Sequence, residues 1–544
     1  MVESSSMIKE SWRDSSIGRI GSFLKSVFAG TGSSGRGGID GKQSIYVAAA
    51  LFRISPGHGT PVDEVTWTDL AMDEVFAEMD RTASVLGRQV LYSQLRCYAR
   101  DREVLNERSR QRTLFREEHS FRDAIRRLLT RLERSGAESL LPFLHSPLPL
   151  APRFGWVFLL MAALTGSSVF GCIFFPRLVV VTLAFALINA VTYLTYGQRI
   201  LPHFTSLSQI SSMLCVAEDL GKLDNPHELP ELQRMRRALP AIRNIKKDLG
   251  WLVLDRSAMP ELVQAIFGYL NIALLLDVVV FLRALGTLRS EQHNLIQIAE
   301  DVGALDASVA AALYAEGLVH SCTPIVVANK RFSVVDLFHP LIESPVSNSM
   351  TLDQGSAVIT GPNMAGKTSF IRAVGISILF AQTLNFCFAR EAIIPCCSVQ
   401  SAIKTEDSLR DGQSYFFAEI KRVQSFLAAG EVDLRFLLID EIFRGTNTVE
   451  RIASSVAVLK HLARDHILLV TTHDIELQGM LADSFSMYHF SDHVVDGKYG
   501  FDYLIRPGVS CTRNAIKLLR ISGYPESVTT EAEDLAARLS NAAE

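Results

Sequence analysis

The segment Ile359 to Ile371, ITGPNMAGKTSFI, constrains the fold of this 544-residue chain more than any other stretch. It places a G-x-x-x-x-G-K-S/T loop between the β-like run Gly355 to Thr360 and a helix-like run. Such a loop turns backbone N–H groups toward phosphate oxygens, and the following helix offers its positive N-terminal end. The pattern predicts a nucleotide triphosphate site. The predicted loop contains Gly361, Pro362, Asn363, Met364, Ala365, Gly366, Lys367, Thr368 and Ser369.

Two side chains of this loop have predicted roles in ATP chemistry. We expect Lys367 to reach the β- and γ-phosphates and Thr368 to ligate Mg²⁺. The alternative is a glycine-rich turn without a ligand, because a match of this kind also arises by chance.

A second motif favours the nucleotide site. The apolar run Phe436 to Ile439 is typical of a buried parallel strand, and it ends in two carboxylates, Asp440 and Glu441. Asp440 is a candidate for the Mg²⁺ shell, and Glu441 is a candidate general base that polarises the attacking water. The alternative is a capped strand end.

A third predicted strand, Ile467 to Val470, runs into Thr471-Thr472-His473-Asp474. Open α/β sheets bind ligands at the carboxyl ends of their strands. We therefore predict that His473 contacts the γ-phosphate or the attacking water, although most single histidines are ordinary surface or core residues.

These motifs resemble the ATPase domain of the MutS family, a branch of the ABC-type ATPases associated with DNA mismatch repair. The resemblance rests on TGPNMAGKTSFIRAVG, LLIDEIFRGTNT and VTTHDIEL. The stretch Asp407 to Glu419 is similar to the signature segment of that family. In the family, the serine represented here by Ser414 completes the nucleotide site of the opposite subunit. The resemblance therefore implies a homodimer.

Three further segments extend the resemblance. Val346 lies where adenine-contacting residues sit in the family, and Pro345 replaces a usual aromatic residue, which leaves Val346 to pack on the base. Residues 514–526 resemble a closing helical segment that supports dimerisation. A third, fainter resemblance, to the helical core and first lever, covers Trp67 to Leu95 and Arg102 to Leu132. Only about 60 residues precede that core, so we expect the mismatch-reading domains to be absent.

Two uncharged apolar runs, Phe154 to Phe175 and Leu178 to Gly197, flank Pro176-Arg177. Runs of about 20 residues fit a bilayer crossing, so they predict a transmembrane helical hairpin; the alternative is a pair of soluble core helices. Arginines on both flanks, and the need for ATP, predict that both flanks face the cytoplasm. Ala265 to Leu282 is interrupted by Asn271 and Asp277. We interpret it as a buried lever helix, the alternative being membrane insertion.

The predicted fold is multidomain, with a helical core and lever region, a transmembrane helical hairpin and an α/β P-loop ATPase of ABC type. The expected parts are a flexible segment at 1–61, core and outgoing lever at 62–153, the hairpin at 154–197, the returning lever at 198–320, the ATPase at 321–535 and a tail at 536–544.

Composition bounds the function only loosely. Lys and Arg number 54 against 58 acidic residues. The net charge of −4 therefore does not show the overall excess of positive charge that is typical of nucleic-acid-binding domains. DNA as a partner therefore rests on the resemblance alone. We expect a membrane-tethered, dimeric MutS-like ATPase that binds DNA without mismatch selectivity. The alternative is a membrane ATPase switch that acts on a protein or lipid partner.

Overall fold

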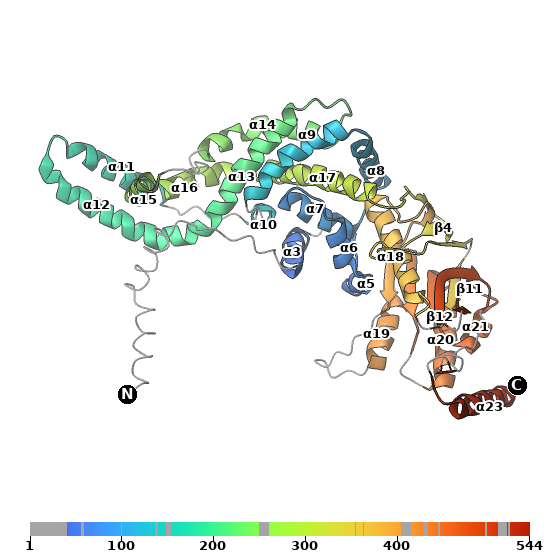
Figure 1. Ribbon diagram of the computed structural model, residues 1–544. Helices are drawn as coiled ribbons and strands as arrows, with labels where there is room; N and C mark the ends of the chain where they lie inside the picture. The colour runs from blue at the N-terminus through green and yellow to red at the C-terminus, as the bar shows by residue number, and fades with distance from the viewer. Residues whose placement is uncertain are drawn as a thin grey trace, which may run out of the picture. The chain divides into compact units, whose positions relative to one another are not determined.

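The computed structural model describes residues 41–55, 59–99, 101–135, 140–147, 154–249, 260–353, 355–362, 364–403, 415–427, 434–443, 447–495, 498–509, 519–520 and 523–543. These residues form two compact units (Figure 1). Unit 1 holds the described residues of 1–55, 82–90 and 120–307, and unit 2 holds those of 56–81, 91–119 and 308–544. This division follows packing, whereas the domain boundaries expected above are drawn along the sequence.

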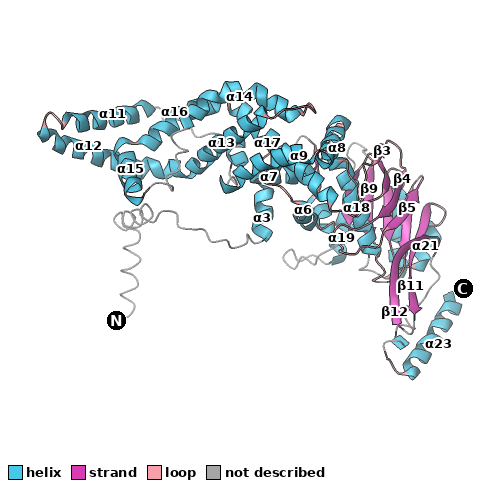
Figure 2. Ribbon diagram, turned by 45° about the horizontal axis from the view of Figure 1, so that its top comes forward, coloured by secondary structure: helices cyan, strands magenta, loops and turns pink. Residues whose placement is uncertain are grey.

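Unit 1 is helical throughout its described residues, and every described strand belongs to unit 2 (Figure 2). The helices of unit 1 are α3 (Gly41–Ala48), α4 (Ala50–Ile54), most of α9 (His119–Leu129), η1 (Thr130–Ser135), α10 (Leu140–His145), α11 (Gly155–Gly171), η3 (Pro176–Leu178), α12 (Val179–Thr192), η4 (Tyr193–Gly197), α13 (Gln198–Lys222), α14 (Pro230–Leu249), α15 (Glu261–Leu274) and α16 (Leu276–Ser290). The helices α7 (Val85–Arg96) and α17 (Gln292–Glu316) contribute residues to both units.

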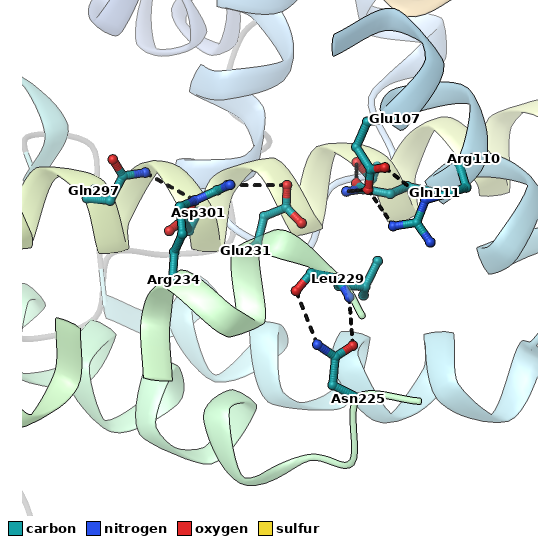
Figure 3. Close-up of polar contacts among 10 residues, drawn as sticks. Glu107, Arg110, Gln111, Asn225, Leu229, Glu231, Arg234, Gln297 and Asp301 are labelled. Atoms are coloured by element: carbon teal, nitrogen blue, oxygen red, sulfur yellow. Dashed lines mark hydrogen bonds and ion pairs between the residues drawn. The ribbon is translucent and has the colours of Figure 1, made fainter. Parts of the chain in front are cut away.

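An ion pair between the half-exposed Arg234 and the buried Asp301 joins α14 to α17 within unit 1 (Figure 3). The guanidinium of Arg234 donates twice to Asp301 Oδ1, at 2.9 and 2.6 Å, and Gln297 donates to the same oxygen at 3.2 Å. Asp301 is only 2 % exposed, and burial raises its pKa to about 6 against the opposing effect of Arg234. Partners of this kind are required where a carboxylate is removed from water.

The two uncharged runs form the predicted pair of helices. α11 and α12 pack against each other, and the 3₁₀ turn at Pro176–Leu178 connects them. Within the described residues, the stretch Pro176–Thr195 is long and apolar enough to cross a membrane, with a mean hydropathy of 2.1. Gly155–Gly171 is apolar but shorter. The helical hairpin is therefore confirmed, and its membrane crossing stays a prediction.

The interpretation of Ala265 to Leu282 as one buried lever helix is wrong. The segment breaks at Leu275, whose φ is 50°, and the two helical parts on either side differ in direction by 59°. Asn271 and Asp277 are the reason for the break, because the Asn271 side chain accepts a hydrogen bond from the Asp277 amide at 3.0 Å and so replaces the helical acceptor of that amide. On α15, Ile266 and Tyr269 are exposed.

Unit 2 contains two larger sheets and the helices that surround them. Its strands are β1 (Thr60–Pro61), β2 (Cys97–Tyr98), β3 (Ile325–Val327), β4 (Phe332–Leu337), β5 (Asn348–Leu352), β6 (Ser356–Thr360), β7 (Glu391–Pro395), β8 (Ser398–Ala402), β9 (Arg435–Asp440), β10 (Ile467–Thr471), β11 (Phe485–Val495) and β12 (Lys498–Pro507). Its other helices are α5 (Glu64–Asp69), α6 (Met72–Met79), α8 (Arg102–Glu117), α18 (Lys367–Leu384), α19 (Tyr415–Leu427), α20 (Thr448–Leu462), α21 (Ile475–Leu481) and α23 (Glu526–Ala543).

The six-stranded sheet has the order β12-β11-β6-β10-β9-β8, and all its neighbours are parallel except β11 and β12. All five residues of β6 and of β10 are buried, as expected for strands that helices cover on both faces. The three predicted motifs follow β6, β9 and β10, which are neighbours. Their loops therefore meet at one edge of the sheet, and the predicted α/β fold of this part is confirmed.

Helices from the N-terminal half pack on this sheet as part of unit 2. Arg112 of α8 donates to the carbonyl oxygens of Leu384 and Asn385 at 3.0 and 3.1 Å, and Arg108 donates to that of Thr383. These are the last carbonyls of α18, so the two arginines cap the helix that follows the phosphate loop. Burial lowers the pKa of each arginine to about 10.

Both ends of the chain differ from the expected segments. Within 1–61, which we expected to be flexible, the structure places α3, α4 and β1, and Leu51 of α4 is buried. The glycine-rich tract at 30–38 lies outside the described residues. The expected tail at 536–544 continues helix α23 as far as Ala543, because its alanines favour a helix.

Candidate nucleotide-binding site

The phosphate loop connects β6 to α18 through backbone conformations that favour glycine. Gly361 has a φ of +141°, and a Cβ added there would lie 2.7 Å from the carbonyl oxygen of Phe490. Gly366 has a φ of +101° and directly precedes α18. Met364 also lies at positive φ, 71°, with 84 % of its surface exposed. The loop therefore turns tightly enough to present the N-terminus of α18 to a ligand.

Lys367 and Thr368 begin α18 and are held by different groups. The ammonium of Lys367 donates to the carbonyl oxygens of Gly361 and Pro362, at 2.6 and 3.0 Å. The Thr368 hydroxyl donates to Asp440 Oδ2 at 2.9 Å, and the Thr471 hydroxyl donates to Asp440 Oδ1. Asp440 thus lies between the phosphate loop and β10.

The Glu441 carboxylate and the His473 imidazole are in contact at the same edge of the sheet. The distance from Glu441 Oε1 to His473 Nδ1 is 3.0 Å, and the Glu441 amide donates to the Thr471 carbonyl at 3.0 Å. The Glu441 side chain is 14 % exposed, and that of His473 is 52 % exposed. The two residues predicted to act on the attacking water are therefore in contact.

The phosphate loop, the start of α18 and the end of β9 line a common cavity of about 740 Å³. Of the predicted residues, it is lined by Val346, Pro362, Met364, Gly366, Lys367, Thr368, Ser369, Asp440 and Glu441. Gly361, Ala365 and His473 do not line it: Gly361 forms the turn, Ala365 is buried, and His473 contacts Glu441. Asn363 and Ser414 lie outside the described residues.

Sequence reasoning missed four aromatic residues of the cavity wall, Phe338, Phe370, Phe490 and Tyr503. Tyr503 lies on β12, 45 % exposed, with a φ of 57°. Asn348 fixes this strand by donating to the Tyr503 carbonyl at 3.0 Å and accepting from the Ile505 amide at 2.7 Å. No motif surrounds Tyr503, so only the pairing of β12 with β11 could have identified it.

His339 also lines the cavity. The sequence could have indicated it, because the segment Phe338-His339-Pro340 resembles the stretch that leads into the ATPase domain of the MutS family. Burial and the nearby charge of Arg372 lower the pKa of His339 to about 4. The imidazole is therefore neutral at pH 7, and its Nδ1 accepts a hydrogen bond from the Leu341 amide at 3.2 Å.

The oxygen ligands fit Mg²⁺. Mg²⁺ is usually held by one or two protein oxygens together with water and substrate phosphates. The Thr368 hydroxyl and the Asp440 carboxylate supply two such oxygens beside the phosphate loop. Among the described residues, no group of three or more His, Cys, Asp or Glu is arranged to hold a metal by itself.

Comparison with known proteins agrees with this site. MutS domain V matches residues 357–540. The chain is 30 % identical over 250 residues to the DNA mismatch repair protein MutS 2 of Halobacterium salinarum, covering 44 % of this chain and 28 % of that protein. It is 32 % identical over 212 residues to the DNA mismatch repair protein MutS of Aquifex pyrophilus, covering 37 % and 25 %. With the MutS protein homolog 4 of Mus musculus, the identity is 28 % over 269 residues, covering 45 % and 27 %.

The matched part of the chain thus spans about a quarter of the length of these relatives. The match includes the phosphate loop, Asp440, Glu441 and His473. The C-terminal part of the chain, and with it the site described above, is therefore similar to domain V of the MutS proteins.

Proposed function

We propose that this protein binds ATP with Mg²⁺ and hydrolyses it at the cavity between the phosphate loop and β12. One observation carries this proposal. Lys367 and Thr368 of one segment and Asp440 and Glu441 of another, about 70 residues apart in the chain, line a single cavity. A strand-capping or simple turn role would not require them to converge.

The residues present suit phosphoryl transfer to water. Lys367 stabilises the negative charge of the phosphates, and Thr368 with Asp440 holds Mg²⁺. When bound, the metal neutralises charge that develops on the phosphate oxygens. Glu441 accepts the proton of the attacking water, and His473 orients the Glu441 carboxylate through their 3.0 Å contact.

A broader role follows by analogy with the relatives. We infer a homodimer in which Ser414 of each chain completes the site of the other, and a protein that binds DNA without mismatch selectivity. The similarity to MutS domain V supports the dimer, and the mismatch-repair names of the relatives support DNA as the ligand; the absence of mismatch selectivity is tested below. We further propose that α11 and α12 tether the protein to a membrane, with the ATPase in the cytoplasm.

A second candidate is a membrane ATPase switch that acts on a protein or lipid partner. The composition favours it, because 54 basic against 58 acidic residues leave no net positive charge for a nucleic-acid partner. Both candidates share the nucleotide site and the membrane tether, and they differ only in the ligand.

The ATPase proposal is tested with the full-length protein in detergent. ATP binding and phosphate release are measured for the wild type, for Lys367→Ala and for Lys460→Ala, which removes an exposed lysine from α20. We expect Lys367→Ala to lose ATP binding and turnover and Lys460→Ala to keep both. A wild type that neither binds nor hydrolyses ATP contradicts the proposal.

Fluorescence anisotropy separates the two candidates. Homoduplex, mismatched and branched DNA are titrated at several salt concentrations, with and without ATP. DNA binding predicts an affinity that falls steeply with salt, because phosphate contacts release counterions. Equal affinity for homoduplex and mismatched DNA supports the absence of mismatch selectivity. No binding at low salt favours the switch.

A further inference from the structure

The helices α11, α12 and α15 have an inverted distribution of polar and apolar side chains. In the apolar stretch Pro176–Thr195, only 11 % of the residues are buried. Phe174, Val180 and Leu187 are each more than 60 % exposed, whereas the polar residues Thr165 and Asn189 are 1 % exposed. Water-soluble proteins place such residues the other way round. A hydrocarbon solvent is the environment that suits this pattern.

α15 continues this apolar surface. Its exposed large residues are Leu262, Val263, Ile266, Tyr269 and Leu270. They recur at spacings of three and four positions, so they occupy one face of the helix. Leu262 to Leu274 contains no charged residue. α15 also packs against both α11 and α12, so the three apolar surfaces belong to one assembly.

Asn189 of α12 connects α15 to the hairpin through hydrogen bonds. Its side-chain amide donates to Thr165 Oγ1 of α11 at 2.9 Å and to the Ala273 carbonyl of α15 at 2.5 Å. In an unbroken helix, the Asp277 amide would bond to that carbonyl, but here it bonds to Asn271. Asn189 therefore satisfies a carbonyl that the break sets free. Broken helices in a bilayer require such a partner, because lipid tails offer none.

The depth and direction of α15 distinguish it from a third crossing. α15 has 14 residues, about 21 Å, which is shorter than the hydrocarbon core of about 30 Å. In Figure 1, α15 is seen nearly end-on beside α11 and α12, whose axes run across the picture. Asn189 lies six residues before Thr195, the end of the apolar stretch, or about 9 Å along the helix axis. Interfacial helices bury their apolar face to a similar depth, about 5–10 Å into the boundary between headgroups and acyl chains.

We infer that α15 is an interfacial membrane helix, which crosses the hairpin and inserts its Leu262–Leu270 face into the lipid. This inference rests on the proposed membrane tether and adds a third lipid contact to it. A hairpin alone is free to rotate about its long axis, whereas a crossing helix in the interface fixes the rotation of unit 1 against the bilayer.

Photo-crosslinking to lipid tests the inference. The photoreactive residue p-benzoylphenylalanine replaces Tyr269, Phe174 or Tyr46 in the full-length protein, reconstituted into phosphatidylethanolamine and phosphatidylglycerol vesicles. The three side chains have similar exposed fractions, 59, 65 and 65 %. Phe174 reports on the hairpin tip, and Tyr46 of α3 is the control for unit 1 outside the proposed membrane contact. Lipid adducts are identified by mass.

We expect lipid adducts at Phe174 and Tyr269 and none at Tyr46. An adduct at Phe174 alone overturns the inference and leaves the tether standing. The absence of lipid adducts at both Phe174 and Tyr269 overturns the proposed membrane tether as well. A crosslinked product of doubled protein mass at Tyr269 would show that this face of α15 contacts a second copy of the chain. Lipid adducts at all three positions would indicate general adsorption of lipid to the protein surface. Each of these two results overturns the inference.

Asn189 is tested as a positioning residue. Asn189→Leu preserves the volume but removes both hydrogen bonds, and Thr192→Val removes an exposed hydroxyl from the same helix as a control. We expect Asn189→Leu to lose the lipid adduct at Tyr269 and keep that at Phe174, while Thr192→Val keeps both. An unchanged Tyr269 adduct in Asn189→Leu overturns the role of Asn189.

Discussion

Glu441 and Phe443 adopt backbone conformations that ordinary residues rarely take, with φ values of 58° and 60°. Both are held by specific contacts: the Glu441 amide donates to Thr471, and the Phe443 amide donates to the buried carboxylate of Glu419. Strain of this kind persists only where the surroundings enforce it, and it concentrates at functional sites. Here it directs the Glu441 carboxylate toward both the cavity and His473.

At the residue scale, we predict that Glu441→Gln still binds ATP but hydrolyses it about 10²- to 10⁴-fold more slowly, because the amide cannot accept the proton of the attacking water. Phosphate release and ATP binding are measured in parallel. The control Glu450→Gln changes an exposed carboxylate at the start of α20, outside the cavity, and should behave as the wild type. Unchanged turnover in Glu441→Gln would remove this residue from the mechanism.

Tyr503 is the second test at this scale. If its ring stacks on the base of the nucleotide, Tyr503→Ala should weaken ATP binding roughly 5- to 150-fold, which corresponds to about 1–3 kcal/mol of stacking. Tyr503→Phe should retain most of the affinity. Binding of inorganic tripolyphosphate, which has no base, should be the same in all three proteins. A loss of tripolyphosphate binding in Tyr503→Ala would instead indicate a damaged phosphate loop.

At the scale of elements, α11 and α12 contact each other through polar side chains: Asn189 donates to Thr165 Oγ1 at 2.9 Å, and Cys172 Sγ lies 3.3 Å from Thr182 Oγ1. Leu164 and Leu187 lie on their outer surfaces, with 42 % and 67 % of each residue exposed. In water, a charge at such positions would change the free energy of unfolding by no more than about 0.5 kcal/mol. In a bilayer, the same charge would be strongly unfavourable. The two environments are therefore distinguishable by substitution.

We predict that Leu164→Arg combined with Leu187→Arg releases the protein from membranes or prevents its accumulation, since each arginine costs about 2.5 to 3.5 kcal/mol at a helix centre on insertion scales. Membrane association is measured by carbonate extraction. The matched control is Leu164→Phe with Leu187→Phe, which should remain in the membrane fraction. Recovery of the wild type in the soluble fraction without detergent would show that these helices are not inserted.

At the scale of the whole molecule, the nucleotide site and the helices of the N-terminal half are physically connected within unit 2. Arg108 and Arg112 of α8 cap the C-terminus of α18, the helix that begins at Lys367. Ser401 of β8 donates to Asp69 of α5 at 2.6 Å. A change at the phosphate loop therefore acts on a single packed body that includes α5 and α8.

Dimerisation is tested at this scale by mixing variants. Lys367→Ala disables the phosphate loop, and Ser414→Arg disables the predicted contribution to the partner's site. Each homodimer should be inactive, but a heterodimer places both changes in one composite site and leaves the other intact. We expect mixing to restore up to half the wild-type rate per heterodimer. No recovery, with heterodimers demonstrated by differential tagging, contradicts the shared site.

The sequence by itself determined the elements whose causes are local. Phe436 to Ile439 and Ile467 to Val470 are continuous apolar runs, so they had to be buried strands, and the glycine spacing after Thr360 required a tight loop before a helix. The two uncharged runs around Pro176 are helical for a similar reason. Because parallel strands align their carboxyl ends, the meeting of Thr368, Asp440 and Glu441 was also predictable.

Only the tertiary structure decided what depends on pairing across long separations. Tyr503 reaches the cavity because β12 pairs with β11 and β11 pairs with β6, and no local pattern encodes that register. The helix α15 ends at Leu274 because the Asn271 side chain binds the Asp277 amide, six residues away. The Ala273 carbonyl that loses this amide accepts a hydrogen bond from Asn189 of another helix. The described residues of 56–81 and 91–119 belong to unit 2, where Arg112 and the Thr66 hydroxyl bond to residues of the C-terminal part of the chain. Such contacts have no signature along the chain, since the free energy that selects them arises only when distant segments pack together.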